Sequence, residues 1–179
     1  MKSILGVLLV GAFLLSSCQG EAAEPKAAPQ TTAPANPDAT LPPMPAAANE
    51  FTPSGASTFV RHYVEVMEYA SQTGDVSELK RLSFEDCEGC NRYIDVFVDM
   101  YAKGGYSKPR DWSVGGINLL FNKHEGYEST ARTSLKLSTG TIKSSSEATE
   151  HTYPKTSGKV ILGLVFDDGW RMSQIAGKE

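Results

Sequence analysis

The sequence is poor in the residues that usually mark chemistry, with three cysteines, three histidines and two tryptophans in 179 residues. It shows no Ser/His/Asp order, no phosphate-binding glycine loop and no spacing typical of metal ligands. Its 17 basic and 21 acidic residues are spread without runs of one sign, which argues against a nucleic-acid-binding face and a polybasic membrane patch. We therefore expect no cofactor, no metal and no nucleic-acid partner.

No apolar run is long enough for a membrane-spanning helix, which needs roughly 20 apolar residues. The longest run extends from Ile4 to Leu15 after the single basic residue Lys2. This is the length of the apolar region of a signal peptide, which is removed after export. We therefore predict that residues 1–17 are an export signal and take no part in the fold.

The four residues Leu15-Ser16-Ser17-Cys18 resemble the lipobox of bacterial lipoproteins, in which a leucine and two small residues precede an invariant cysteine. The resemblance implies that the peptide is cut before Cys18 and that this thiol carries a diacylglycerol. Acyl chains such as palmitate, at about 0.8 kcal/mol per buried methylene, hold a protein on a lipid bilayer without a spanning helix. We expect a lipoprotein of the cell envelope, anchored on the extracytoplasmic side of the cell membrane. Secretion without a lipid is the alternative.

A segment rich in alanine and proline follows the expected anchor. Residues 18–50 hold seven of the ten prolines, and Leu41 and Met44 are their only larger apolar side chains. Such a composition buries too little surface to offset the entropy of ordering the chain. We expect a disordered tether over residues 18–50. It would carry one domain, residues 51–179, which is large enough to form its own core.

The first half of this domain has the periodicity of helices. Residues 58–73 carry an apolar stripe, with Ser54 as the expected N-cap and Gly74 as the glycine that ends the helix. Because its polar strip is narrow, we expect this helix to lie inside a curved sheet. A short second helix over residues 75–82 and a third over residues 87–103 follow.

The second half has the periodicity of strands. Residues 127–138 alternate apolar and polar side chains, which is typical of a half-buried strand, and residues 112–121 indicate a strand with a bulge at two adjacent glycines. Residues 159–166 indicate a central strand, and Asp168-Gly169 a hairpin turn to a last strand over residues 170–175. The order predicts an α+β, cone-like fold, with three N-terminal helices on a curved, mostly antiparallel sheet of about four to five strands.

Two resemblances follow from these features. The helices and a sheet that ends in Asp-Asp-Gly and Trp-Arg-Met-Ser (167–173) resemble the cone-shaped fold of the nuclear transport factor two-like superfamily. The lipobox, the tether, Phe-Val-Arg-His-Tyr-Val (59–64) and Asp-Cys-Glu-Gly-Cys (86–90) are similar to a family of uncharacterised actinobacterial lipoproteins. The resemblances imply a fold and an anchor. They supply no function, because the cone fold hosts isomerases, dehydratases and binding modules alike.

Cys87 and Cys90 lie at the expected start of the third helix. An exported chain meets an oxidising environment and Cys18 is expected to carry a lipid, so we expect these two to form a local structural disulfide. Two alternatives stay open. The pair could cycle as a thiol-disulfide redox site, because a helix N-terminus lowers the pKa of a cysteine thiol, or it could bind zinc together with the histidines.

Four side chains are candidates for the lining of a pocket in the sheet concavity, namely His62, Tyr63, Trp112 and Trp170. Aromatic side chains at such positions are also typical of an ordinary core. The function that we expect is the non-catalytic binding of a small apolar ligand or of another envelope protein in this concavity. The redox protein described above is one alternative.

A pocket enzyme of the isomerase or dehydratase type is the other alternative, and it requires a carboxylate or a histidine inside the cavity. Asp95 and Asp99 are the carboxylates that the third helix offers. They share a face with Arg92 and Lys103, at spacings that favour ion pairs on a solvated surface. We therefore assign no catalytic residue.

Overall fold

The computed structural model describes residues 36, 38–108 and 110–177. The predicted signal peptide, Cys18 and the tether up to residue 35 lie outside this range, so that cleavage and lipidation stay predictions. The architecture is α+β as predicted, with three helices packed on mostly antiparallel sheets that do not close. No helix in the described part of the chain is long and apolar enough to cross a bilayer.

The helical layer comprises η1 (Ala46–Asn49), α1 (Pro53–Thr73), α2 (Ser77–Arg81) and α3 (Glu88–Ala102). The N-cap of α1 is Thr52, whose Oγ1 accepts a hydrogen bond from the Gly55 amide at 2.9 Å, so the prediction of Ser54 is wrong. Pro53 explains the earlier start, because the first helical position needs no N–H donor. Gly74 ends α1 as predicted, in the left-handed conformation with φ of 75°.

The main sheet has five strands, β2 (Trp112–Val114), β3 (Asn118–Leu120), β4 (Ser129–Leu137), β7 (Thr156–Phe166) and β8 (Trp170–Gly177). β4 pairs with β2 and β3 on one side and with β7 on the other, and β7 pairs in turn with β8. The central position predicted for residues 159–166 is confirmed. The predicted hairpin turn is also present, with φ of 53° at Asp168 and 133° at Gly169.

A bulge separates β2 from β3, which the sequence presents as one strand. Val114 pairs with Leu135 and Asn118 pairs with Arg132. Four steps along the first strand (114 to 118) therefore face three steps along β4 (135 to 132). The extra residue falls in the segment that begins with the two adjacent glycines, which confirms the predicted bulge.

A second sheet was not predicted from the sequence. It comprises β1 (Tyr106–Ser107), β5 (Gly140–Lys143) and β6 (His151–Tyr153), in the order β1-β5-β6. β4 with β5 and β6 with β7 form one long hairpin that leaves the main sheet after Ser138 and rejoins it after Pro154. Residues 149–159 are all exposed. β6 therefore has no buried face and no apolar alternation, and β1 and β5 have only two and four residues, which is why sequence patterns missed this sheet.

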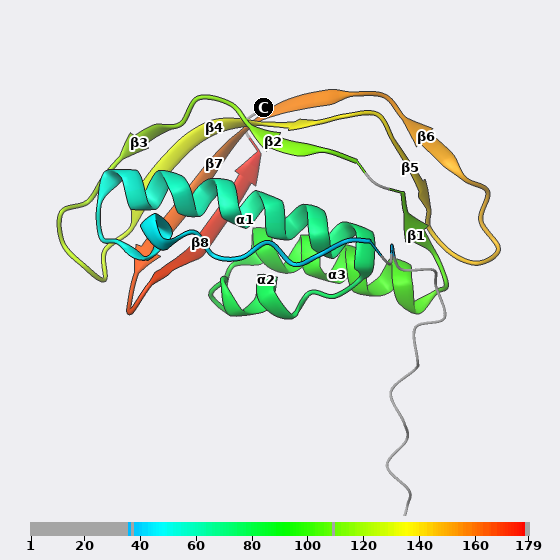
Figure 1. Ribbon diagram of the computed structural model, residues 1–179, viewed down its shortest axis with the longest axis horizontal. Coiled ribbons are helices and arrows are strands. Elements are labelled where there is room, and N and C mark those ends of the chain that lie inside the picture. The colour runs from blue at the N-terminus through cyan, green and yellow to red at the C-terminus, as the bar shows by residue number, and fades with distance from the viewer. Residues whose placement is uncertain (1–35, 37, 109, 178–179) are drawn as a thin grey trace, which may run out of the picture.

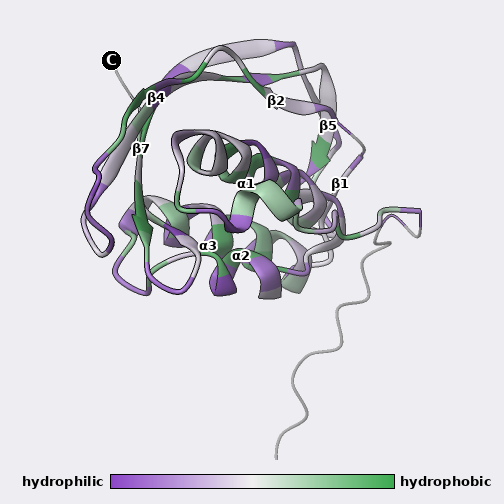
Figure 2. Ribbon diagram, turned by 60° about the vertical axis from the view of Figure 1, so that its left-hand side comes forward, coloured by the Kyte–Doolittle hydropathy of each residue, from purple (hydrophilic) through white to green (hydrophobic). Residues whose placement is uncertain are grey.

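The two sheets arch around α1, and α2 and α3 cover the opposite side of that helix (Figures 1 and 2). The apolar stripe of α1 is the centre of the core, with Phe59, Val60 and Val66 at 0 % exposure. From β4, Ala131 at 0 % and Ser129 at 1 % exposure contribute the facing surface. The wide apolar arc of α1 thus has the cause predicted for it, a helix inside a curved sheet.

The packed chain begins earlier than residue 51, where the predicted tether ends. Residues 38–50, here named the strap, run antiparallel along α1 (Figure 1). The Asn36 amide donates to the Gln72 carbonyl at 3.2 Å near the end of α1, and Ala48 is only 1 % exposed. At the other end of the strap, Trp170 Nε1 donates to the Glu50 carbonyl at 2.9 Å. The composition of residues 38–50 did not predict this packing, because a few well-placed apolar side chains, Ala48 among them, suffice to dock the strap.

Candidate functional site

An apolar cavity of about 290 Å³ lies where the ends of α1 and α3 meet the second sheet. We name it the α3 cavity. Its apolar lining comes from α3, β2, β5 and β6 and consists of Val96, Phe97, Met100, Trp112, Ile142 and Tyr153. Two of these side chains remain largely exposed, Val96 at 61 % and Tyr153 at 42 %. They form an apolar rim that is open to solvent.

Arg110 supports the bend of the hairpin from inside this cavity. Its Nε donates to the Ser138 carbonyl at 2.6 Å, and its Nη2 lies 3.4 Å from the Pro154 carbonyl. One side chain thus binds both strands of the hairpin where they leave the main sheet. Gly140 makes room for it, because a Cβ there would lie 2.5 Å from Arg110 Cδ.

Trp112 forms the wall of the cavity between α3 and the main sheet. Its ring packs edge-on against Tyr93 at 6.5 Å and Phe97 at 6.4 Å between centroids. Its amide donates to Glu68 Oε2 at 3.0 Å, which joins β2 to α1. Burial raises the pKa of the Glu68 carboxyl, and the Trp112 hydrogen bond partly offsets this. The indole Nε1 is enclosed and has no partner among the described residues.

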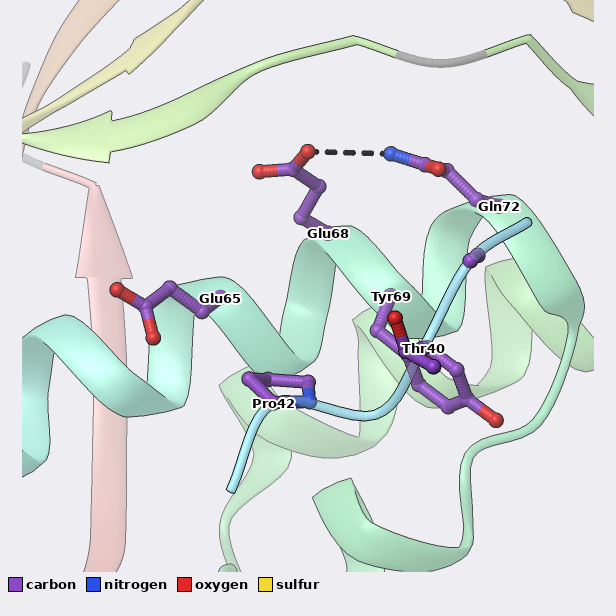
Figure 3. Close-up of a pocket in the computed structure, with 7 residues that line it drawn as sticks. Thr40, Pro42, Glu65, Glu68, Tyr69 and Gln72 are labelled. Carbon is purple, nitrogen blue, oxygen red and sulfur yellow. Dashed lines mark hydrogen bonds between the residues drawn. The ribbon is translucent and has the colours of Figure 1, made fainter. Parts of the chain in front are cut away.

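A second hollow, of about 270 Å³, lies between the strap and α1. Figure 3 shows Thr40 and Pro42 of the strap crossing over side chains of α1. Gln72 Nε2 donates to Glu68 Oε1 at 3.1 Å, so two of the polar side chains of α1 in this hollow bind each other. We assign this hollow to the docking of the strap. No group of three or more metal-ligating side chains occurs in the described ranges.

The four predicted pocket residues do not line one pocket in the structure. Trp112 lines the α3 cavity, whereas Trp170 is 3 % exposed and belongs to an aromatic cluster near the start of α1. Tyr63 is 1 % exposed and shares a hydrogen bond of 2.8 Å with Ser83 Oγ. Burial raises the pKa of Tyr63 to about 12. His62 lines none of the hollows described here.

His62 is a core residue with unusual surroundings. It is 1 % exposed, and neither ring nitrogen has a partner among the described residues. Burial lowers the pKa of His62 below its ordinary value of 6.5, although Glu65 and Glu78 act in the opposite direction. The structure therefore favours a neutral imidazole in the core at neutral pH.

The carboxylates expected on the solvated face of α3 lie there. Asp95 is exposed. Asp99 Oδ2 accepts from Lys103 Nζ at 2.6 Å, with side-chain exposures of 63 % and 58 %. Asp99 also lines the α3 cavity, where it is the one carboxylate among the described lining residues.

Cys87 and Cys90 form a disulfide with a Cα–Cα distance of 5.3 Å. Both are fully enclosed, at 1 % and 0 % exposure. Cys87 is also the N-cap of α3, and its sulfur accepts a hydrogen bond from the Cys90 amide at 3.2 Å. Gly89 lets this turn pack on β8, because a Cβ there would lie 2.0 Å from the Ile175 carbonyl oxygen.

Most of the residues that line the α3 cavity were not predicted from the sequence. Met100, Ile142 and Tyr153 lie on three elements that are distant along the chain, and two of these elements belong to the sheet that has no apolar alternation. Arg110 lies in a connecting segment without a motif. A buried arginine that binds two distant carbonyls leaves no mark in single-sequence periodicity, so an alignment or a structure is needed to find it.

Comparison with known proteins relates the chain to one family. A model of DUF6318, described as a family of unknown function, matches residues 26–176. No curated protein matches the chain. Among solved structures, a presumed aromatic ring hydroxylase from Novosphingobium aromaticivorans is 12 % identical, with 69 % of this chain and 84 % of that chain covered and a TM-score of 0.34. A match this distant carries no argument about function.

Proposed function

The chain belongs to DUF6318, a family of unknown function, and from this premise we propose a function that rests on the α3 cavity. The protein is a lipoprotein of the cell envelope, anchored in the membrane on its extracytoplasmic side, whose domain binds a small ligand without converting it. The sheets around α1 correspond to the cone-shaped fold of the nuclear transport factor two-like superfamily. The ligand occupies the α3 cavity at the open end of this cone.

The observation that carries this proposal is the lining of the cavity. Small-molecule sites are concave and mostly apolar, with a few well-placed polar groups. The α3 cavity has this composition, because Phe97, Met100 and Ile142 line it together with the buried polar side chain of Arg110. A small ligand fits this concave shape better than a flat protein surface does.

The distribution of titratable groups supports binding rather than catalysis. A pocket enzyme would need a carboxylate or histidine held inside the cavity with a shifted pKa. Asp99 lies at the exposed side of the lining and is paired with Lys103, and His62 is enclosed in the core. Neither is placed to exchange a proton with a bound molecule.

Binding of a neutral fluorescent probe, 1-aminoanthracene, tests the cavity. The full chain carrying Cys18→Ser, purified without detergent, should bind the probe saturably at one site. Ile142→Trp fills the cavity and should weaken binding about tenfold, or about 1.4 kcal/mol. The control Leu120→Trp lies on β3 at an exposed position and should leave affinity unchanged. Equal affinity in both variants would overturn the proposed site.

Metabolic labelling with palmitate tests the anchor separately. The wild-type protein should take up the label and partition into detergent, whereas Cys18→Ser should do neither, because the thiol is the attachment point that the lipobox implies. Labelling that persists in the variant would contradict this assignment. The outcome is independent of the cavity.

The disulfide is proposed as a structural staple rather than a redox centre. Reactive cysteines lie in partly exposed sites, whereas Cys87 and Cys90 are both buried. Mass spectrometry of the folded protein after mild reduction and alkylation should show both sulfurs unmodified. Rapid alkylation under native conditions would favour the redox alternative.

A further inference from the structure

We infer that the ligand of the α3 cavity is a small amphipathic anion, with a carboxylate bound by the Arg110 guanidinium and the Trp112 indole N–H. Its apolar body lies against Phe97 and Met100. This inference rests on the proposed function and adds the chemical class of the ligand. It follows from the charge, the free donors and the size of the cavity.

The buried charged group of the cavity is a cation. Arg110 is 8 % exposed, and none of the four ion pairs among the described residues includes it. Its partners in that part of the chain are two backbone carbonyls, those of Ser138 and Pro154. A buried cation without a counter-charge is costly, and an anion brought by a ligand removes that cost.

Asp99 does not supply this counter-charge. Although it lines the cavity, its carboxylate accepts from Lys103 Nζ at 2.6 Å. Both of these side chains are more than half exposed, at 63 % and 58 %, so they lie at the mouth and neutralise each other. The interior therefore keeps the unpaired charge of Arg110.

Unused hydrogen-bond donors point to the same ligand group. A guanidinium has five N–H groups, and the hydrogen bonds of Arg110 to described residues involve only Nε and Nη2. The Trp112 indole N–H is enclosed without an acceptor. Burying an unsatisfied donor costs free energy, and a carboxylate has acceptor sites for more than one donor.

The size and lining of the cavity define the rest of the ligand. Its volume of about 290 Å³ is at the lower end of the roughly 300–1,000 Å³ typical of ligand sites. An acyl chain of about ten carbons or a small fused aromatic ring system fits this space, and a whole membrane lipid does not. The exposed apolar side chains of Val96 and Tyr153 at the rim provide the entry for such a body.

A ligand panel on the unmutated cavity tests the inference first. Decanoate, decan-1-ol and decyltrimethylammonium share one chain length and differ in the head group. Each is titrated against bound 1-aminoanthracene in the chain that carries Cys18→Ser. Decanoate should displace the probe at about a tenfold lower concentration than decan-1-ol, because hydrogen bonds to a charged group are the stronger ones. The cation should displace it least.

Two variants test whether the proposed hydrogen-bond donors cause the preference for decanoate. Arg110→Gln should abolish the preference for decanoate over decan-1-ol, and Trp112→Phe, which removes the N–H and keeps a ring, should reduce it about threefold. The control Arg132→Gln, at an exposed position of β4, should leave the preference unchanged. Arg110→Gln could fail to fold if it loosens both strands at the bend. In that case the wild-type panel still tests the preference for an anion, and Trp112→Phe still tests its donor.

The outcomes separate the two proposals. Equal displacement by decanoate and decan-1-ol overturns the anionic ligand and leaves the cavity as a ligand site. A preference for decanoate that survives in both Arg110→Gln and Trp112→Phe overturns the assigned donors. If the probe does not bind at all, the proposed function fails, and this inference fails with it.

Discussion

The two tryptophans occupy opposite ends of α1 and have opposite surroundings. Trp170 is 3 % exposed, lies 5.2 to 6.2 Å from three phenylalanine rings, and donates its indole N–H to the Glu50 carbonyl. Trp112 is only partly buried, borders a cavity, and its indole N–H has no described partner. The same side chain closes the core at one end and leaves room at the other.

The sheet explains this difference. In β7, Leu162 and Leu164 belong to the core, whereas residues 156–159 are all exposed. The sheet extends past the end of α1 and then bends (Figure 1), and Arg110 supports the bend through its hydrogen bonds to the Ser138 and Pro154 carbonyls. We infer that stability resides in the aromatic end, and binding in the end that the core does not fill.

Truncating each tryptophan should give the largest difference in stability between the two ends of α1. Trp170→Ala should lower the free energy of unfolding by about 3–5 kcal/mol, the range for a large side chain removed from a packed core. Trp112→Ala should lower it by about 1–2 kcal/mol, because less of its surface is buried. Urea unfolding followed by circular dichroism measures both. Equal losses would show that the two ends contribute alike.

Removing the disulfide should cost less. The loop that it closes has only four residues (87 to 90), for which loop-closure entropy predicts about 2 kcal/mol. The double variant Cys87→Ala/Cys90→Ala should lose about this amount in urea unfolding and retain its affinity for 1-aminoanthracene. A loss of probe binding would show that the staple shapes the cavity as well.

Two glycines of the long hairpin provide a finer test of the bend. Gly140→Ala places a Cβ against Arg110 and should destabilise the protein by about 1–3 kcal/mol. At Gly158 a Cβ would meet nothing within 4 Å, so Gly158→Ala should be neutral or stabilise by up to about 1 kcal/mol. Thermal unfolding compares them. If Gly140→Ala behaves like Gly158→Ala, Arg110 does not fix the bend.

The smallest expected effect is a dependence of stability on pH, caused by a histidine in the core. The pKa of His62 is lower in the folded protein than the ordinary 6.5. Between these two pKa values the unfolded chain binds more protons, so stability should fall as pH decreases below about 6.5. His62→Phe should weaken this decline in urea unfolding at pH 7 and pH 5. His124→Gln, at an exposed position, should leave it unchanged.

The sequence predicted the elements that have a buried face and a strong period. α1, α3, β4, β7 and β8 follow from apolar stripes or alternation, and the turn at Asp168-Gly169 follows from its two residues. The strap and the second sheet were missed, because few of their side chains are buried. Of the four predicted pocket residues only Trp112 reaches the cavity. Burial alone does not tell a core aromatic side chain from one that borders empty space.

The indole N–H signals of the two tryptophans test the central claim most directly. In a ¹H–¹⁵N correlation spectrum of the Cys18→Ser chain, each indole gives its own signal, which Trp112→Phe assigns. On titration with 1-aminoanthracene we expect the Trp112 signal to shift with saturation and the Trp170 signal to stay in place. A shift of Trp170 alone, or no shift of Trp112 while the probe binds, would contradict a ligand site at the open end of the fold.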